Sequence, residues 1–159
     1  MPHIHEKIDF TATALIIHDN RVLLRKHDKY GIWIGVGGHI ELDEDANTAV
    51  LREAAEEVGL EITLIPPPHW NITAANSNMY HELIPPMFMN IHKINETHQH
   101  HDLIFIATSK TQDVIPENPT DQWKWCTKED IENFEGLEPR MRTYALFALE
   151  LVKKTQLPR

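Results

Sequence analysis

The segment Gly38–Leu60 restricts the possible folds more than any other part of the chain, because it specifies a helix with two distinct faces. Either Asp43 or Asp45 is placed to cap the start of this helix, which the sequence predicts to run to Val58. Gly59 follows at the position where a left-handed residue commonly ends a helix. At about 100° of rotation per residue, one arc of the helix is apolar and is expected to face a core. Its members are Ala46, Val50, Leu51, Ala54 and Val58.

The neighbouring arc of the same helix carries the carboxylates of Glu53, Glu56 and Glu57 within one turn. Like charges at this spacing destabilise a helix by about 0.2–0.5 kcal/mol per pair, and a solvated acidic face is the simplest interpretation. Two features favour a binding site instead. Arg52 is positioned to hold the Glu56 carboxylate, and a Gly-Gly turn ahead of the helix lets backbone carbonyls come close. Clustered carboxylates with a carbonyl oxygen suit Mg²⁺ or Mn²⁺.

The rest of the chain predicts several strands and one further long helix. A β-hairpin is expected across His18-Asp19-Asn20, and a proline-rich stretch over 66–86 is expected to be a long surface loop. Apolar residues at helical spacing between Met141 and Val152 indicate a C-terminal amphipathic helix. Strands mixed with two well-separated helices favour a single α/β domain over residues 1–159. Further strands are expected at 33–36, 61–65, 87–94, 102–109 and 122–126.

The residues of the helical segment also resemble a known family motif, the Nudix box. In that motif a Gly is followed after five residues by Glu, and after seven more by Arg-Glu-apolar-any-Glu-Glu-any-Gly-apolar. Ala54 and Leu60 fill the two apolar positions. The fixed positions are all filled here, by Gly38, Glu44, Arg52, Glu53, Glu56, Glu57 and Gly59. The chain thus resembles the Nudix hydrolases.

This resemblance implies a Nudix-type α/β/α sandwich with a mixed central sheet. It also implies divalent-metal-dependent hydrolysis of a pyrophosphate bond in a nucleoside diphosphate linked to another moiety, as in a nucleoside triphosphate, ADP-ribose or a related nucleotide. By position, the metal ligands would be the carboxylates of Glu53, Glu56 and Glu57 and the carbonyl of Gly38. The expected cofactor is Mg²⁺, for which Mn²⁺ can substitute.

The resemblance assigns supporting roles to other residues of the motif. Glu44 would assist metal binding directly or through water, and Arg52 would pair with Glu56 and orient it. The general base is expected to be Glu53 or Glu57, since unperturbed glutamate is already ionised at pH 7. The family also uses a glutamate from a later loop, and Glu96 is the candidate for that role here.

Composition and charge favour a small-molecule substrate over a macromolecular one. The chain has 15 Lys and Arg against 24 Asp and Glu, a net charge of −9, which opposes binding to DNA. No apolar run is long enough for a signal peptide or a membrane span, and the single cysteine, Cys126, forms no internal disulfide. We therefore expect a cytoplasmic protein that binds a nucleotide but neither DNA nor a membrane, and we retain a homodimer as a hypothesis.

Two further regions offer candidate substrate contacts. In the sequence His98-Gln-His-His-Asp102, alternation places His98, His100 and Asp102 on one face of a strand and His101 on the other. Three interpretations stay open: a zinc site that lacks a recognisable fourth ligand, a polar strand end in the substrate cleft, and a solvated strand end. In the cleft, His100 or Asp102 would contact phosphate or sugar. Trp70 would either stack on a base or be buried, whereas Trp33, Trp123 and Trp125 are expected in the core.

Three alternative functions follow from the same residues. A non-catalytic nucleotide sensor with this fold should have lost carboxylates of the motif, and none is lost here. An RNA 5′-end pyrophosphohydrolase is disfavoured by the acidic charge. An isoprenoid diphosphate isomerase needs a reactive cysteine, and Cys126 is the only one.

Overall fold

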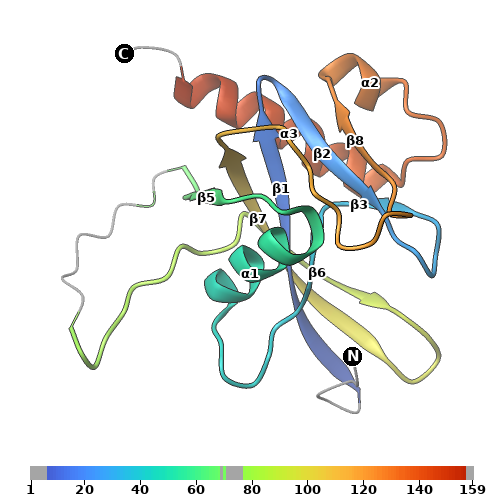
Figure 1. Ribbon diagram of the computed structural model, residues 1–159. Helices are drawn as coiled ribbons and strands as arrows, with labels where there is room; N and C mark the ends of the chain where they lie inside the picture. The colour runs from blue at the N-terminus through green and yellow to red at the C-terminus, as the bar shows by residue number, and fades with distance from the viewer. Residues whose placement is uncertain (1–6, 69, 71–76, 157–159) are drawn as a thin grey trace.

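The computed structural model describes residues 7–68, 70 and 77–156 (Figure 1). One eight-stranded sheet lies between helices in this part of the chain. The strands are β1 (Ile8–His18), β2 (Arg21–Lys26), β3 (Trp33–Ile34), β4 (Val36–His39), β5 (Ile62–Ile65), β6 (Phe88–Lys93), β7 (Gln99–Ser109) and β8 (Trp123–Cys126). The helices are α1 (Ala46–Val58), α2 (Lys128–Glu132) and α3 (Pro139–Gln156).

Two long strands, β1 and β7, form the centre of the sheet and run parallel to each other. Each pairs with two shorter strands along different parts of its length. β1 pairs with β4 and β2, and β7 pairs with β6 and β5, all antiparallel. The sheet is therefore mixed, as predicted.

The two faces of the sheet are covered by different helices, which gives three layers. In Figure 1, α1 lies in front of the sheet and α3 lies behind it. One core joins α1 to side chains such as Phe105, and a second core joins α2 and α3 to side chains such as Ile104. The α/β/α sandwich is confirmed. Leu51, however, is 41% exposed, so the predicted apolar arc of α1 is too wide by this residue.

The turn and cap residues fold as the sequence predicts. Asp19 and Asn20 both have positive φ, 44° and 58°, which matches the twist of a two-residue hairpin turn between β1 and β2. Asp45, not Asp43, caps α1, since its side chain accepts hydrogen bonds from the backbone N–H groups of Asn47 and Thr48. Gly59 ends the helix at a φ of 66°.

The predicted Gly-Gly turn is wrong, because Gly37 and Gly38 lie inside strand β4. A side chain at Gly37 would overlap the carbonyl oxygen of Ala12 on the adjacent strand, and one at Gly38 would meet Glu53. The glycines therefore allow close approach of β1 and α1 to β4, rather than a change of chain direction.

Two other details differ from expectation, whereas the loop over 66–86 agrees with it. The short helix α2, capped by Thr127, has no counterpart in the sequence prediction. Trp123 is 38% exposed and does not belong to the core, whereas Trp125 packs against one of the two cores. The loop over 66–86, where described, contains only the isolated bridge between Ser77 and Tyr80, as a surface excursion should.

Alternation along β1 and β7 produces a polar floor on the α3 side of the sheet. The parallel register places Asp9 opposite His100 and Thr11 opposite Asp102. Further along the same face the side chains become apolar, and those of Leu15 and Ile104 belong to the α3 core. The polar half of this face is thus left beside the start of α3, where a pocket opens.

Candidate active site

Arg52 on α1 ties three carboxylates of the motif together. Its Nη2 donates to Glu44 Oε1 at 2.6 Å and its Nε donates to Glu44 Oε2 at 3.1 Å, a two-pronged contact. Its Nη1 donates to Glu53 Oε1 and to Glu56 Oε2, both at 2.9 Å. Nη2 also donates to the His39 carbonyl at 3.1 Å, which fixes the start of α1 against the end of β4.

Glu53 projects from α1 against Gly38 of β4. A Cβ at Gly38 would lie 2.5 Å from Glu53 Oε1, so only glycine leaves room for this carboxylate. Glu53 is 8% exposed, and its burial raises the pKa of the carboxyl group. The Glu56 side chain, in contrast, is 56% exposed.

Glu57 is held between β4 and β2. Its Oε2 accepts a hydrogen bond from the Gly37 N–H at 3.0 Å, and its Oε1 lies 3.2 Å from Arg25 Nη1. Burial raises the pKa of Glu57 to about 7 despite the Arg25 charge. Glu44 shows the opposite shift, because hydrogen bonds from Arg52 lower the pKa of its carboxyl group. The motif therefore combines two carboxyl groups whose pKa is raised by burial, Glu53 and Glu57, with one carboxylate, Glu44, whose ionised form is stabilised by Arg52.

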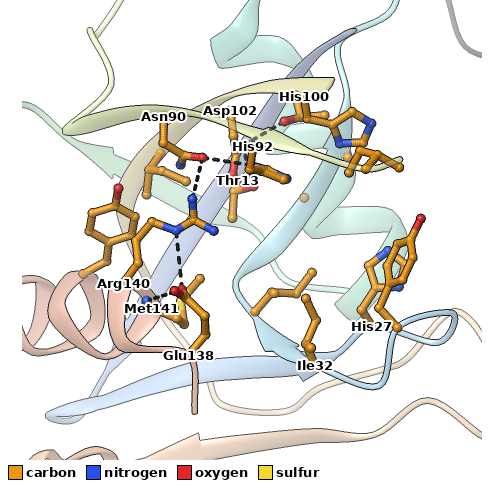
Figure 2. Close-up of a pocket in the computed structure, with 18 of the residues that line it drawn as sticks. Thr13, His27, Ile32, Asn90, His92, His100, Asp102, Glu138, Arg140 and Met141 are labelled. Carbon is orange, nitrogen blue, oxygen red and sulfur yellow. Dashed lines mark hydrogen bonds and ion pairs between the residues drawn. The ribbon is translucent and has the colours of Figure 1, made fainter. Parts of the chain in front are cut away.

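A pocket of about 430 Å³ lies on the other side of β4, between the sheet and the start of α3. Gly37 and Gly38 line it, so the strand that contacts Glu53 and Glu57 also forms a wall of the pocket. Aromatic rings line other walls, including those of Tyr30, Trp33 and Tyr144. Figure 2 shows polar side chains from β6, β7 and α3 along one side of the pocket and Ile32 and His27 on the opposite side.

The polar side of the pocket is built from residues on four elements, β1, β6, β7 and α3. Asp102 accepts hydrogen bonds from the Thr11 and Thr13 hydroxyls, each at 2.9 Å, and its burial raises the pKa of the carboxyl group. Arg140 at the start of α3 donates to Asn90 Oδ1 on β6 at 3.1 Å, as Figure 2 shows. Such convergent polar groups in an otherwise aromatic pocket are typical of a small-molecule site.

Histidines surround the Asp9 carboxylate at one end of this pocket. Asp9 is 1% exposed, and its Oδ2 lies 3.2 Å from His98 Nε2 and 3.3 Å from His39 Nε2. The ring of His100 packs edge-on against those of His39, His92 and His98. Burial, together with these neighbouring rings, lowers the pKa of His100 to about 4, so this imidazole is neutral at pH 7.

The structure brings together most, but not all, of the residues selected from the sequence. His100 and Asp102 line the pocket. The motif side chains from Glu44 to Glu57 gather on the α1 side of β4 and do not line the pocket themselves. Trp70 is half-buried and Glu96 is exposed in the turn between β6 and β7, and neither is among the residues lining this pocket.

Four contributing residues were missed by the sequence analysis. Arg25 follows the apolar run Val22-Leu23-Leu24 on β2, but Lys26 comes directly after it, so the sequence did not mark Arg25 as the buried partner of Glu57. Asn90 and His92 are two residues apart on β6, but the sequence of this strand contains no motif that distinguishes them as site residues. Arg140 precedes the apolar periodicity of α3 and was overlooked for that reason.

The carboxylate cluster fits a divalent cation of the Mg²⁺ type. All of its donors are oxygens, which such ions prefer, and the space kept by Gly38 brings the Glu53 carboxylate against the β4 backbone. Burial of Glu53 and Glu57 raises the pKa of both groups. A cation bound beside them would stabilise the ionised carboxylates and so lower both pKa values. Glu53, Glu56, Glu57 and the Gly38 carbonyl are the groups that would hold the ion.

Comparison with known proteins agrees with this geometry. The NUDIX domain model matches residues 9–147. A hydrolase of the NUDIX family from Clostridium perfringens has a similar structure, with a TM-score of 0.78 and 30% identity over 91% of this chain and 97% of that one. The MutT NUDIX hydrolase from Burkholderia pseudomallei shares the fold, with a TM-score of 0.61 and 23% identity over 92% and 99% of the two chains.

A curated sequence relative matches over a shorter stretch. The CTP pyrophosphohydrolase of Escherichia coli (strain K12) is 37% identical over 57 residues, which are 33% of this chain and 42% of that protein. The match thus spans about two fifths of the relative's length. In the part of this chain that the structure describes, no helix has the length and apolar character needed to cross a membrane. The domain match and the carboxylates assembled around Arg52 together place this chain in the Nudix hydrolase family.

Proposed function

We propose that this protein is a divalent-metal-dependent hydrolase that cleaves a pyrophosphate bond in a nucleotide. The observation that carries the proposal is the position of β4, whose glycine pair touches Glu53 and Glu57 on one side and lines the pocket on the other. A nucleotide seated in the pocket would therefore present its phosphates at the carboxylate cluster.

Different residues of the chain would bind the metal ion, accept a proton and position the metal ligands in this reaction. The carboxylates of Glu53, Glu56 and Glu57 would hold Mg²⁺, which when bound activates water and neutralises phosphate charge. Glu53 or Glu57 is the proposed general base, since the bound cation would keep both carboxylates ionised and able to accept a proton from water. Arg52 and Glu44 are positioning residues, because their mutual contacts fix the orientation of Glu53 and Glu56.

The pocket supports a nucleoside as the part of the substrate that is recognised. Its aromatic rings offer faces for stacking, and Asn90, Asp102 and Arg140 offer donors and acceptors for a base or sugar. A nucleoside triphosphate is the first substrate class to test, because the Escherichia coli relative is a CTP pyrophosphohydrolase. ADP-ribose and dinucleotides are the next.

The other roles stay predictions from the sequence. Trp70 and Glu96 are proposed substrate-side residues, and His100 is proposed as a phosphate or sugar contact. The homodimer, the cytoplasmic location and the lack of affinity for DNA are likewise proposals that rest on composition and charge.

The test is a substrate panel assayed for release of phosphate, pyrophosphate and nucleoside monophosphate. The panel holds the four common nucleoside triphosphates, oxidised nucleotides, ADP-ribose, NADH, dinucleoside polyphosphates, nucleotide sugars and a 5′-triphosphorylated RNA. Each compound is assayed with Mg²⁺, with Mn²⁺ and with EDTA. Turnover of a free nucleotide that EDTA abolishes supports the proposal. Binding of a nucleotide without turnover would favour the sensor, and preferential turnover of the RNA would favour the RNA 5′-end enzyme.

A further inference from the structure

We propose a second metal site, separate from the carboxylate cluster, in which Asp9, His98 and His100 bind Zn²⁺ at the end of the pocket. One oxygen or nitrogen atom from each of these three residues lies within 4.8 Å of the other two. Asp9 and His100 are paired residues of the two central strands, and His98 lies in the turn one residue before β7.

The spacing of the Asp9 and His98 donor atoms matches that of two ligands in a tetrahedral zinc site. Bonds of about 2.0–2.1 Å place the ligand atoms of such a site roughly 3.3 Å apart. Asp9 Oδ2 lies 3.2 Å from His98 Nε2 and 3.3 Å from His39 Nε2. The Asp9 and His98 donors therefore need little movement to hold an ion. The His100 donor lies within 4.8 Å of both, and His39, beside the carboxylate, would turn toward the ion as the fourth ligand.

The surroundings also suit a cation. Asp9 is 1% exposed and His98 is 4% exposed, and burying a carboxylate this deeply is costly unless a positive charge accompanies it. Neighbouring strands keep the rings together: Asp9 pairs with His100, Thr11 pairs with both His39 and Asp102, and His92 pairs with His100. A protonated histidine is the competing source of that charge, and the experiment below separates the two.

The chemistry of the donors distinguishes this site from the carboxylate cluster. Imidazole nitrogen prefers Zn²⁺, Co²⁺ and Ni²⁺, whereas an all-oxygen cluster suits Mg²⁺. Asp9 and His100 face the α3 side of the sheet, whereas the three glutamates of the cluster belong to α1 on the other side, so excess Mg²⁺ should fill one site and leave the other to zinc. The proposal goes beyond the hydrolase function and does not depend on it. It also reassigns His100 from a substrate contact to a metal ligand.

The experiment uses the full chain without any affinity tag, stripped of metal and held in excess Mg²⁺. Zn²⁺ affinity is measured by competition with a chromophoric chelator, and Co²⁺ is used in parallel to read the coordination geometry. We expect one tight Zn²⁺ per chain and the intense visible absorption of a four-coordinate Co²⁺ site. Loss of an outer-sphere partner already lowers metal affinity about 10–100-fold, so D9N, H98A and H100A should each lower it by more than about 100-fold.

The matched control is H101A, on the same strand but with its ring against Phe10 on the opposite face. It should bind Zn²⁺ as the unchanged protein does. Zinc binding in H98A and H100A equal to that of the unchanged protein would overturn the proposal, and so would the absence of tight binding in the unchanged protein.

A second measurement covers variants that fail to fold. In the unchanged protein, imidazole nitrogen resonances are followed by NMR as Zn²⁺ is added in the presence of Mg²⁺. The resonances of His98 and His100 should move to new positions that saturate at one equivalent. Resonances that stay in place would overturn the proposal, since a buried ion pair with a protonated histidine needs no zinc.

Discussion

Arg52 donates hydrogen bonds to both carboxylate oxygens of Glu44, at 2.6 Å and 3.1 Å, and its Nη1 also donates to Glu53 and Glu56. The two residues are eight positions apart, and the contact closes the segment between β4 and α1 over the start of the helix. Glu44 therefore acts on the carboxylate cluster through Arg52. Both of its oxygens accept hydrogen bonds from Arg52, as is expected of a positioning residue.

Breaking this contact should lower activity more than it lowers stability. We expect Glu44→Gln to reduce kcat by about 10–100-fold, as loss of an outer-sphere partner does in metal sites, and to destabilise the fold by about 1–3 kcal/mol. Rescue is tested with Glu44→Asp, which retains the charge. The measurements are kcat, the Mg²⁺ concentration at half-maximal rate and the midpoint of urea unfolding. Equal losses in the Gln and Asp variants would contradict a role that depends on the charge.

A methyl group at Gly38 should damage the metal site without unfolding the protein. The added Cβ would lie 2.5 Å from Glu53 Oε1. The Glu53 carboxylate would therefore have to move away from the β4 backbone. We expect Gly38→Ala to weaken Mg²⁺ activation by at least about tenfold with a nearly unchanged unfolding temperature. Gly37→Ala is the contrasting variant, since its Cβ would overlap the Ala12 backbone and should destabilise the fold instead. The expectation fails if Gly38→Ala has the Mg²⁺ dependence of the parent.

The pH dependence of stability should report the burial of Glu57. Its pKa is about 7 in the folded, metal-free protein and about 4.5 in the unfolded chain. A carboxyl with a higher pKa in the folded state stabilises the fold most below the unfolded pKa, and this contribution is lost as the pH rises through the folded pKa. In EDTA, the free energy of unfolding should therefore fall between pH 4.5 and 7, by at most about 3 kcal/mol from this group.

Two comparisons isolate that contribution. Glu57→Gln cannot ionise and should show a smaller fall over the same pH range in urea titrations. Saturating Mg²⁺ should also reduce the fall in the parent protein, because it stabilises the Glu57 anion. The same slope in parent and variant would show that Glu57 titrates at an ordinary pKa.

Substitution in the pocket should change substrate binding and leave metal binding intact. We expect Asn90→Ala to raise KM about tenfold for the best substrate, the cost of one lost hydrogen bond together with the release of Arg140. Trp70→Ala, assayed beside it, tests the hypothesis that this ring stacks on the base. An unchanged KM in the Trp70 variant would remove Trp70 from the substrate contacts, and an unchanged KM in the Asn90 variant would place the nucleoside elsewhere.

The fold was predictable where local chemistry decides it. Asp19-Asn20 specified the hairpin turn and Gly59 the helix end, because few residues accept positive φ. The helix α2 was missed because five residues are too few to show a period. The exposure of Leu51 and Trp123 could not be predicted either, since the width of a buried face depends on what packs against it.

The site was predictable only in part, for a related reason. The carboxylates of α1 follow from a contiguous motif, and the structure places them together around Arg52. Asp9 and His100 are 91 residues apart and meet because β1 and β7 are parallel neighbours, a pairing that no local pattern specifies. Arg140 and Asn90 are 50 residues apart in sequence and are likewise brought together only by the fold.

The most direct test of the hydrolase proposal is the turnover of the best nucleotide substrate by the parent protein and by Glu57→Gln, each measured with EDTA and then with Mg²⁺. We predict that the parent is inactive in EDTA and recovers fully with Mg²⁺. We predict that Glu57→Gln, with an unchanged circular dichroism spectrum, loses at least about 100-fold in kcat. Turnover that persists in EDTA, or a folded Glu57→Gln variant with the parent's kcat, would contradict a metal-dependent reaction at this carboxylate cluster.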